Sequence, residues 1–236
     1  MKIAVCDIRI SKSAVKALES HADRVLLLPP FTSLSEPVSS HPDMLMFPFE
    51  NENMILTHAQ YADKLKTVIG SYDLQIVPIP EIAGDKYPND IMLNAVIFGK
   101  HLFGRLPYLS SSLISLADKS GFIKHDVRQG YTKCSVCKVS DNAMITSDPS
   151  IASVADSVGI DVLIISDGGV ELPPYSHGFI GGASGSDGEN VFFCGDIKTH
   201  QNGKEITDFC IKHKKKPVSL SQDRLYDVGT IFFLDV

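Results

Sequence analysis

The sequence lacks the long apolar run and the excess of positive charge that mark two large classes of protein. None of its apolar stretches approaches the roughly 20 residues that span a bilayer, so we expect no membrane contact. Its net charge of -6 argues against a general nucleic-acid binder, which would need a basic surface. The N-terminal stretch does not fit a signal peptide, because its apolar run stops at Asp7 and no small-residue cleavage site follows.

What is present fits an ordinary globular chain. Hydrophobic residues make up 44% of the 236 residues and charged residues 21%, and this length suits one domain of good size. The near-even spacing of repeated units along the chain favours a single domain over residues 1–236. The five cysteines form an odd, scattered set, which predicts reduced thiols and a cytoplasmic protein.

Two of the cysteines, Cys134 and Cys137, form a Cys-x-x-Cys pair. A zinc site usually needs two close ligand pairs, and the sequence has no second one. A thioredoxin-type pair needs a strand–helix junction, whereas "CSVCKV" is strand-like and the next helix start is at Asp148 and Pro149. The pattern therefore predicts neither a metal site nor a redox site, and we expect no cofactor.

The same stretch contains one copy of a repeat. A strand, a turn, a second strand, a helix and an apolar strand follow one another, which is a ββαβ unit. The pattern recurs over residues 42–78, 88–127 and 177–221, with Gly99 in a hairpin turn of the second copy and Thr57 with Gln60 as a capping box in the first. The chain begins with strand, helix and strand and ends with a strand, so its two ends complete a fifth unit.

Corresponding positions in the units recur at spacings of 47, 44, 44 and 51 residues. This regularity predicts an α/β fold of five ββαβ blades in a closed ring, since closure removes exposed sheet edges. A doubly wound sheet is the competing architecture, because strands and helices alternate. The hairpins before each helix argue against it, since a purely parallel βαβ chain would lack them.

Five ββαβ blades around a pseudo-fivefold axis resemble the pentein fold, the fold of the guanidino-group-modifying enzymes. The resemblance covers essentially the whole chain and implies a pseudo-fivefold α/β propeller. In the enzymes, acidic residues hold the guanidinium group, a histidine transfers protons and a cysteine is the nucleophile. A non-catalytic member, the ribosome anti-association initiation factor, shares the fold.

Only part of that machinery matches this sequence. Asp43 and Asp90 stand where the enzymes carry substrate-binding acids, and Asn94 follows Asp90 on the same face. Tyr131 occupies the place of the catalytic histidine, with Lys133 just after it. The resemblance thus implies that Asp43, Asp90, Asn94, Tyr131 and Lys133 bind substrate. The alternative is that Asp43 and Asp90 are turn or strand-entry residues that bond to their own backbone, and that Lys133 is their ion-pair partner or is solvated.

The nucleophile is also absent from its usual blade, where Gly229 or Thr230 stands. Neither residue can supply a thiolate. Cys134 and His177 lie at the heads of two adjacent blades and are the candidate catalytic pair. The alternative is that Cys134 packs as a small apolar residue and His177 is a hydrogen-bonded residue at a strand end.

Two smaller features complete the prediction. The irregular connector over residues 166–177 is expected to form the rim of a site, with Glu171 and Tyr175 as candidates. Asp7 and Arg9 in the first strand are expected to form an ion pair.

The sequence supports two hypotheses. In the first, the protein acts on a small guanidino or amidino cation, as an amidine hydrolase or amidinotransferase-like enzyme with non-standard machinery. In the second, the same axial pocket belongs to a non-catalytic module that binds a ligand or a protein.

Overall fold

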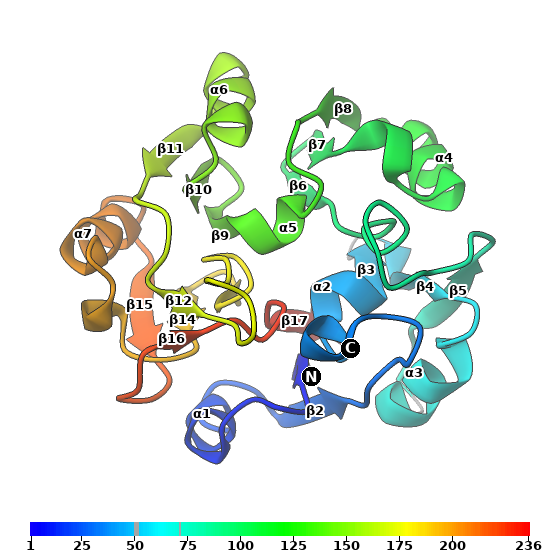
Figure 1. Ribbon diagram of the computed structural model, residues 1–236, viewed down its shortest axis with the longest axis horizontal. Helices are drawn as coiled ribbons and strands as arrows, with labels where there is room; N and C mark the ends of the chain where they lie inside the picture. The colour runs from blue at the N-terminus through cyan, green and yellow to red at the C-terminus, as the bar shows by residue number, and fades with distance from the viewer. Residues whose placement is uncertain (50–51, 71) are drawn as a thin grey trace.

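Five three-stranded sheets of one common order make up most of the computed structural model, which describes residues 1–49, 52–70 and 72–236. In each sheet the first strand pairs antiparallel with the second, and the second pairs parallel with the third. A parallel pair needs a crossover, and a helix supplies it every time (Figure 1). The predicted ββαβ repeat is therefore present, whereas a single doubly wound sheet is not found in the described residues.

We number the units 1 to 5 in the following order. The first strands are β3 (Met46–Phe49), β6 (Val96–Phe98), β9 (Val136–Ser140), β13 (Ser184–Ser186) and β17 (Phe232–Asp235). The second strands are β4 (Met54–His58), β7 (His101–Gly104), β10 (Ala143–Thr146), β14 (Asn190–Phe193) and β1 (Lys2–Asp7). The crossover helices are α3 (Ala62–Ile69), α4 (Ser111–Lys119), α6 (Pro149–Ser157), α7 (Gly203–Lys212) and α1 (Lys12–Leu18). The third strands are β5 (Gln75–Ile79), β8 (Ile123–Asp126), β11 (Asp161–Ile164), β15 (Lys216–Ser219) and β2 (Arg24–Leu28).

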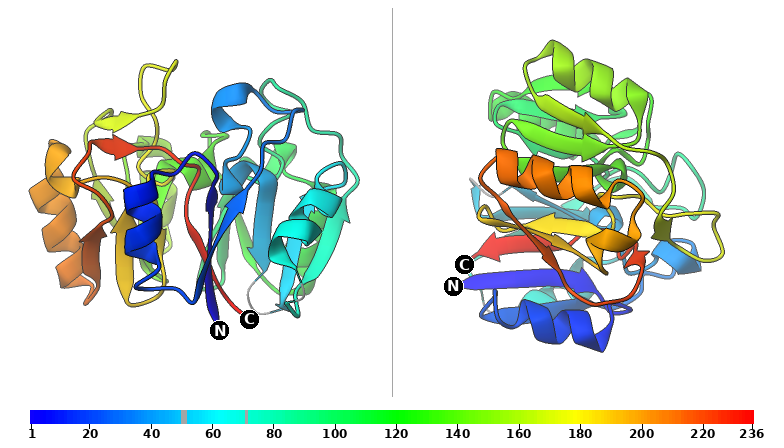
Figure 2. Two further views of the ribbon diagram at one scale, coloured as in Figure 1. Left: turned by 90° about the horizontal axis from the view of Figure 1, so that it is seen from below. Right: turned by 90° about the vertical axis from the view of Figure 1, so that its left-hand side faces the viewer.

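Unit 5 is assembled from both ends of the chain, as the sequence predicts. Strand β17 pairs antiparallel with β1 from Lys2 opposite Asp235 to Val5 opposite Phe232. The amino group of Met1 donates a hydrogen bond of 2.6 Å to the carbonyl oxygen of Val236, so the two termini lie side by side (Figure 2).

Apolar side chains fill the space between neighbouring sheets and under the crossover helices. Helix α4, for example, buries Leu113 and Ala117 on one face. Figure 1 shows the five crossover helices at the rim of the molecule and the short helices α2 (Pro42–Leu45) and α5 (Thr132–Ser135) nearer its middle. No helix within the described ranges has both the length and the apolar character needed to cross a bilayer.

Several local predictions can be compared directly. The turn at Gly99 is present with φ of 54°, and Asp148 caps helix α6 by accepting from the backbone N–H groups of Ser150 and Ile151. The capping box at Thr57 is wrong: helix α3 begins later, at Ala62, and the Thr57 hydroxyl donates to the carbonyl of Leu45 at 2.7 Å.

The strand predicted at Cys134 is also wrong. Cys134 lies in the four-residue helix α5, and strand β9 begins only at Val136. The two cysteines of the Cys-x-x-Cys pair therefore belong to different elements. Cys137 is fully buried in the apolar core beside units 3 and 4.

Candidate functional site

A circle of hydrogen bonds joins the heads of the five units. Each bond runs from a residue just before, or at the start of, a first strand to its counterpart in the next unit. The bonds are Asp43 N to Gly229 O (3.0 Å), Asn94 Nδ2 to Asp43 O (3.2 Å), Lys133 N to Asn94 Oδ1 (2.7 Å), Gly182 N to Cys134 O (2.9 Å) and Thr230 N to Gly182 O (2.8 Å). We call these seven residues the ring layer.

Asn94 is the side chain that links units 1, 2 and 3. Its amide nitrogen donates to the carbonyl of Asp43 and, at 3.0 Å, to the sulfur of Cys134. Its amide oxygen accepts from the backbone N–H groups of Lys133 and Cys134, two donors in the first turn of α5. The N-cap residue of α5, Tyr131, makes no side-chain capping hydrogen bond. Asn94 therefore caps the helix from another unit.

Asp43 and Lys133 place opposite charges in the ring layer. The Asp43 side chain is 1% exposed, and neither carboxylate oxygen has a hydrogen-bond partner among the described residues. Burial raises its pKa, and the positive charge of Lys133 opposes that rise. The Lys133 ammonium donates to the Thr230 hydroxyl at 2.7 Å, and burial lowers its pKa while Asp43 raises it.

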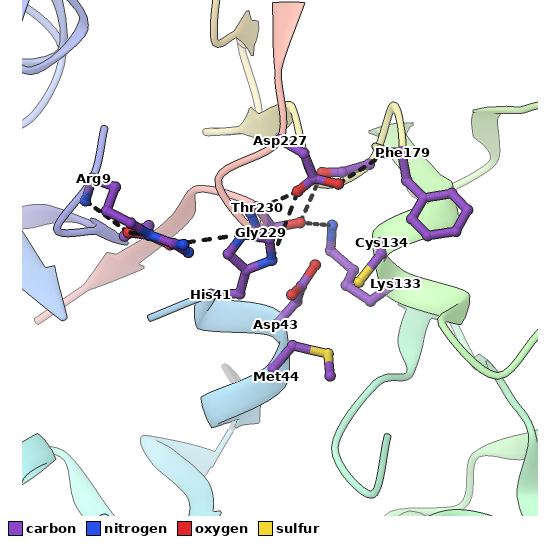
Figure 3. A network of polar contacts seen from close by, with 12 residues as sticks. Arg9, His41, Asp43, Met44, Lys133, Cys134, Phe179, Asp227, Gly229 and Thr230 are labelled. Atoms are coloured by element: carbon purple, nitrogen blue, oxygen red, sulfur yellow. Dashed lines mark hydrogen bonds and ion pairs between the residues drawn. The ribbon is translucent and has the colours of Figure 1, made fainter. Parts of the chain in front are cut away.

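A second buried network runs through His41, two residues before Asp43 (Figure 3). His41 Nδ1 lies 3.8 Å from Asp227, and its Nε2 lies 3.7 Å from Asp7. Arg9 forms the predicted ion pair with Asp7 at 2.5 Å, and Asp7 is fully buried. Burial, aided by the charge of Arg9, lowers the pKa of His41 to about 3, so its imidazole is neutral near pH 7.

Asp227 is a buried carboxyl group whose pKa is raised towards neutrality. Burial and the nearby Asp43 charge raise its pKa to about 7, although the backbone N–H groups of Phe179 and Gly229 donate to it at 2.8 and 2.9 Å. A carboxyl group with such a pKa can exchange a proton or bind a cation at physiological pH.

Glycines allow these side chains to approach the backbone closely. A Cβ at Gly182 would lie 2.0 Å from the Asp227 carboxylate, and one at Gly229 would lie 2.1 Å from the Cβ of His41. Gly229 also has φ of 64°, a conformation that other residues rarely adopt.

A cavity of about 320 Å³ lies over this network. Its acidic lining residues are Asp85, Asp90 and Asp227, and its aromatic ones are Tyr87, Tyr131, Tyr175 and Phe179. His41 and Cys134 also line it. The Tyr131 ring stacks on Phe179 with centroids 6.2 Å apart, and the Tyr131 hydroxyl donates to Asp90 at 2.7 Å.

Asp90 is 5% exposed, and its second oxygen has no hydrogen-bond partner in the described part of the chain. Burial raises its pKa, and the bond from Tyr131 opposes that rise. A carboxylate oxygen without a hydrogen-bond partner beside stacked aromatic rings is an arrangement that suits a cation.

The predicted site residues fall into three groups. Asp43, Asn94, Lys133 and Cys134 meet in or beside the ring layer, and Asp90 with Tyr131 forms a cavity wall. His177 stands apart. It lies at the cavity rim, where its Nε2 is 3.3 Å from Asp167.

Cys134 and His177 line the same cavity, but no hydrogen bond joins them in the described structure. Burial and the charges of Asp43 and Asp227 raise the pKa of Cys134, which favours the protonated thiol. Of the two rim candidates, Tyr175 lines the cavity, whereas Glu171 lines a different one and lies 3.3 Å from Arg224.

The sequence reasoning missed His41 and Asp227. A signal was available in the repeat, because each lies two residues before a ring-layer residue, Asp43 and Gly229 respectively. Tyr131 lies two residues before Lys133 in the same way. Extending the repeat by two residues towards the N-terminus of each unit would have added His41 and Asp227 to Tyr131, which was already predicted.

Two solved structures have a similar fold. An amidinotransferase from Microseira wollei in the saxitoxin biosynthetic pathway superposes with a TM-score of 0.54 at 12% identity, covering 88% of this chain and 72% of that chain. A dimethylarginine dimethylaminohydrolase from Pseudomonas aeruginosa in complex with citrulline gives 0.53 at 12% identity, covering 94% and 91%.

These neighbours are penteins, so the chain has the pentein fold that its repeat predicts. Residues 5–232 match a family of unknown function, DUF6873, and the chain belongs to that family. A comparison with curated proteins gave no match.

Proposed function

We propose that the chain binds a small organic cation with a guanidino or amidino group in the cavity over the ring layer. The observation that carries this proposal is the buried carboxylate of Asp90, which has one oxygen free of hydrogen bonds among the described residues. Asp227 lies in the lining of the same cavity and is partly ionised near pH 7. A planar guanidinium donates paired hydrogen bonds to such carboxylates and stacks against aromatic faces.

We further propose that the five units form a closed five-bladed propeller with this cavity on its axis. The circle of hydrogen bonds through the ring layer supports closure, because it passes once through every unit and returns to Thr230 and Gly229 of unit 5. On this arrangement the cavity collects side chains from several blades.

Cys134 is the group we assign to chemistry on the bound cation. Its thiolate would attack the amidino carbon, the bond from that carbon to an amine would break, and the amine would leave with a proton. Water would then release a ureido product and the free thiol, or an amine would accept the amidino group. A cation bound next to Cys134 would lower the raised pKa of the thiol by favouring the charged form.

Two histidines of the cavity are candidates for the proton transfers. His177 is the one expected from the sequence, but it pairs with Asp167 at the rim. His41 is buried, neutral at pH 7 and set between two carboxylates, of which Asp227 shares the cavity. A pKa of about 3 nevertheless makes His41 a weak base, so we assign it to positioning Asp227 and keep His177 as the candidate for proton transfer.

The alternative is a non-catalytic module that uses the same cavity for a ligand or a protein segment. The raised pKa of Cys134 and its hydrogen bond from Asn94 favour this alternative, since both keep the sulfur protonated or engaged. We keep the cytoplasmic location in the proposal, supported by five cysteines that are all free.

The experiment is titration calorimetry with agmatine, methylated arginines and acetamidine, together with detection of released ammonia, amine or ureido product. Asp90→Asn should weaken binding about tenfold, whereas Asp63→Asn, at a fully exposed carboxylate, should leave it unchanged. Undiminished binding in Asp90→Asn would contradict the proposed cation site.

Product formation separates the two hypotheses. Cys134→Ala should abolish any product while Cys137→Ala, at the other cysteine of the pair, should retain it. His41→Gln and His177→Gln then identify the proton-transfer residue. Binding without product across the whole panel would favour the non-catalytic module.

A further inference from the structure

A second cavity, of about 520 Å³, is lined at one end by Lys133 and Thr230 of the ring layer. The first strands of all five units contribute to its lining, through residues such as Phe47, Ile97, Lys138, Ser186 and Phe232. Among the described residues it shares no lining residue with the first cavity. Consecutive residues nevertheless line the two cavities: Lys133 lines the second cavity and Cys134 lines the first. We call this second cavity the channel.

The lining of the channel mixes polar side chains with a group of aromatic rings. Its aromatic lining residues are Phe47, Phe49, Phe122, Phe232 and Phe233. The rings of Phe47 and Phe49 are 5.2 Å apart, and those of Phe49 and Phe122 are 6.0 Å apart. Such walls favour a ligand with a hydrophobic body.

The inner end of the channel carries a buried cation. Lys133 is 8% exposed, and its ammonium lies 5.8 Å from the centre of the Phe232 ring. An ammonium has three donors, and the one hydrogen bond described for it goes to Thr230. The Thr230 hydroxyl donates onward to the carbonyl of Gly181 at 2.8 Å, which leaves Lys133 as the donor for a ligand.

A second lysine of the channel is already neutralised. Lys138 forms an ion pair of 2.9 Å with Asp141, a carboxylate on the same lining. The other acidic lining residue, Glu52, accepts a hydrogen bond from Ser120. Lys133 lies near the buried Asp43, but no ion pair of its ammonium is found among the described residues, so it is the lining cation open to a ligand.

We propose that the channel is a second ligand site, which takes a small carboxylate with an aromatic or aliphatic body. The carboxylate meets Lys133, and the body lies along the phenylalanine walls. This polarity is the reverse of that in the first cavity, where carboxylates and aromatic rings suit a cation. The inference does not depend on the proposed function, because the two cavities have separate linings.

The test is titration calorimetry of the full chain with 3-phenylpropionate and with its neutral amide. The acid should bind at least about tenfold more tightly than the amide, since only the acid offers a charge to Lys133. Lys133→Met should remove this difference while keeping an apolar side chain of similar length. Equal binding of acid and amide, or no binding of the acid, would overturn the proposal.

Lys133→Met leaves the buried Asp43 without its neighbouring cation, so its folding must be checked by circular dichroism. A second variant avoids that difficulty. Ser186→Trp fills the channel from a partly exposed position on β13 and should abolish binding of the acid. Ser157→Trp, on the exposed face of α6, is the matched control and should bind normally. Normal binding in Ser186→Trp would place the acid elsewhere and overturn the proposal.

Discussion

Three carboxyl groups, those of Asp7, Asp43 and Asp227, are at most 1% exposed and lie around one histidine. Arg9 forms an ion pair with Asp7, and the charge of Lys133 opposes the rise in the pKa of Asp43. The cluster therefore carries more acidic than basic groups. At the scale of the residue, this imbalance makes protonation near neutral pH, or a bound cation, the means of relieving repulsion.

The first prediction concerns the pH dependence of stability. The folded-state pKa of Asp227, about 7, exceeds its ordinary value of 3.8, so between these values the folded chain binds more protons than the unfolded chain. The contribution of Asp227 to stability is therefore present below about pH 4 and is lost as pH rises towards 7. Asp227→Asn should gain stability relative to the unmodified protein, on the order of a few kcal/mol, between pH 4 and pH 8.

Urea unfolding at several pH values gives this difference directly. Comparing variant with unmodified protein at each pH removes the titration of groups that both chains keep and that the Asp227 charge does not affect. A constant difference across pH 4 to 8 would show that the pKa of Asp227 is ordinary.

The second prediction concerns Gly229. Gly229→Ala would place a methyl group against His41 at a positive φ, so the free energy of unfolding should fall by about 3 kcal/mol. Gly188→Ala is the control: φ is 91° there, but no atom lies within 4 Å, so strain alone should cost about 1 kcal/mol. Equal losses in the two variants would mean that contact with His41 does not matter.

At the scale of the element, helices α2 and α5 depend on contacts from other units. Helix α5 has four residues, too few to be stable alone, and its N-cap residue supplies no side-chain hydrogen bond. Asn94 of unit 2 accepts from two of its N–H groups, and Asp43 at the start of α2 donates its N–H to Gly229 of unit 5.

The third prediction follows for Asn94. Asn94→Ala should lower the free energy of unfolding by about 2–3 kcal/mol, because it leaves buried N–H groups of α5 without an acceptor. Asn142→Ala, in an exposed hairpin turn, should change it by less than about 0.5 kcal/mol. Chemical denaturation measures both, and a loss in Asn94→Ala no larger than in the control would contradict the capping role.

These contacts explain what the sequence could and could not predict. The hairpins, crossover helices and split fifth unit follow local patterns of apolar and turn residues, so the repeat was readable. The helix at Cys134 was not, because Asn94, 40 residues earlier, stabilises it. His41 and Asp227 can be located from the repeat, but their contacts with each other, Asp7 and the cavity come from the tertiary structure.

At the scale of the whole molecule, the circle of hydrogen bonds and the pairing of β17 with β1 make the units interdependent. Removing one edge of unit 5 therefore affects more than that unit. Strand β17 contributes Phe233 and Leu234 to two different apolar clusters.

The fourth prediction compares two rearranged chains. Deleting residues 231–236 should abolish cooperative unfolding, because β1 loses its antiparallel partner and buried apolar side chains are removed. A circular permutant that joins Val236 to Met1 by a short glycine linker and begins at Gly121, in an exposed turn, should fold and keep ligand binding. Thermal unfolding by circular dichroism distinguishes the two, and a folded truncated chain would contradict the interdependence.

Because unit 5 combines strands that are far apart in the sequence, its assembly also sets an order of events during protein synthesis. Strand β1 leaves the ribosome more than 200 residues before its partner β17. Until then one edge of β1 has no strand to pair with, and the circle cannot close. Units 1 to 4 can form their hairpins from neighbouring residues as the chain emerges, whereas unit 5 must wait. Contacts of such long sequence separation slow folding, so closure of unit 5 should be the late step by which the molecule becomes complete.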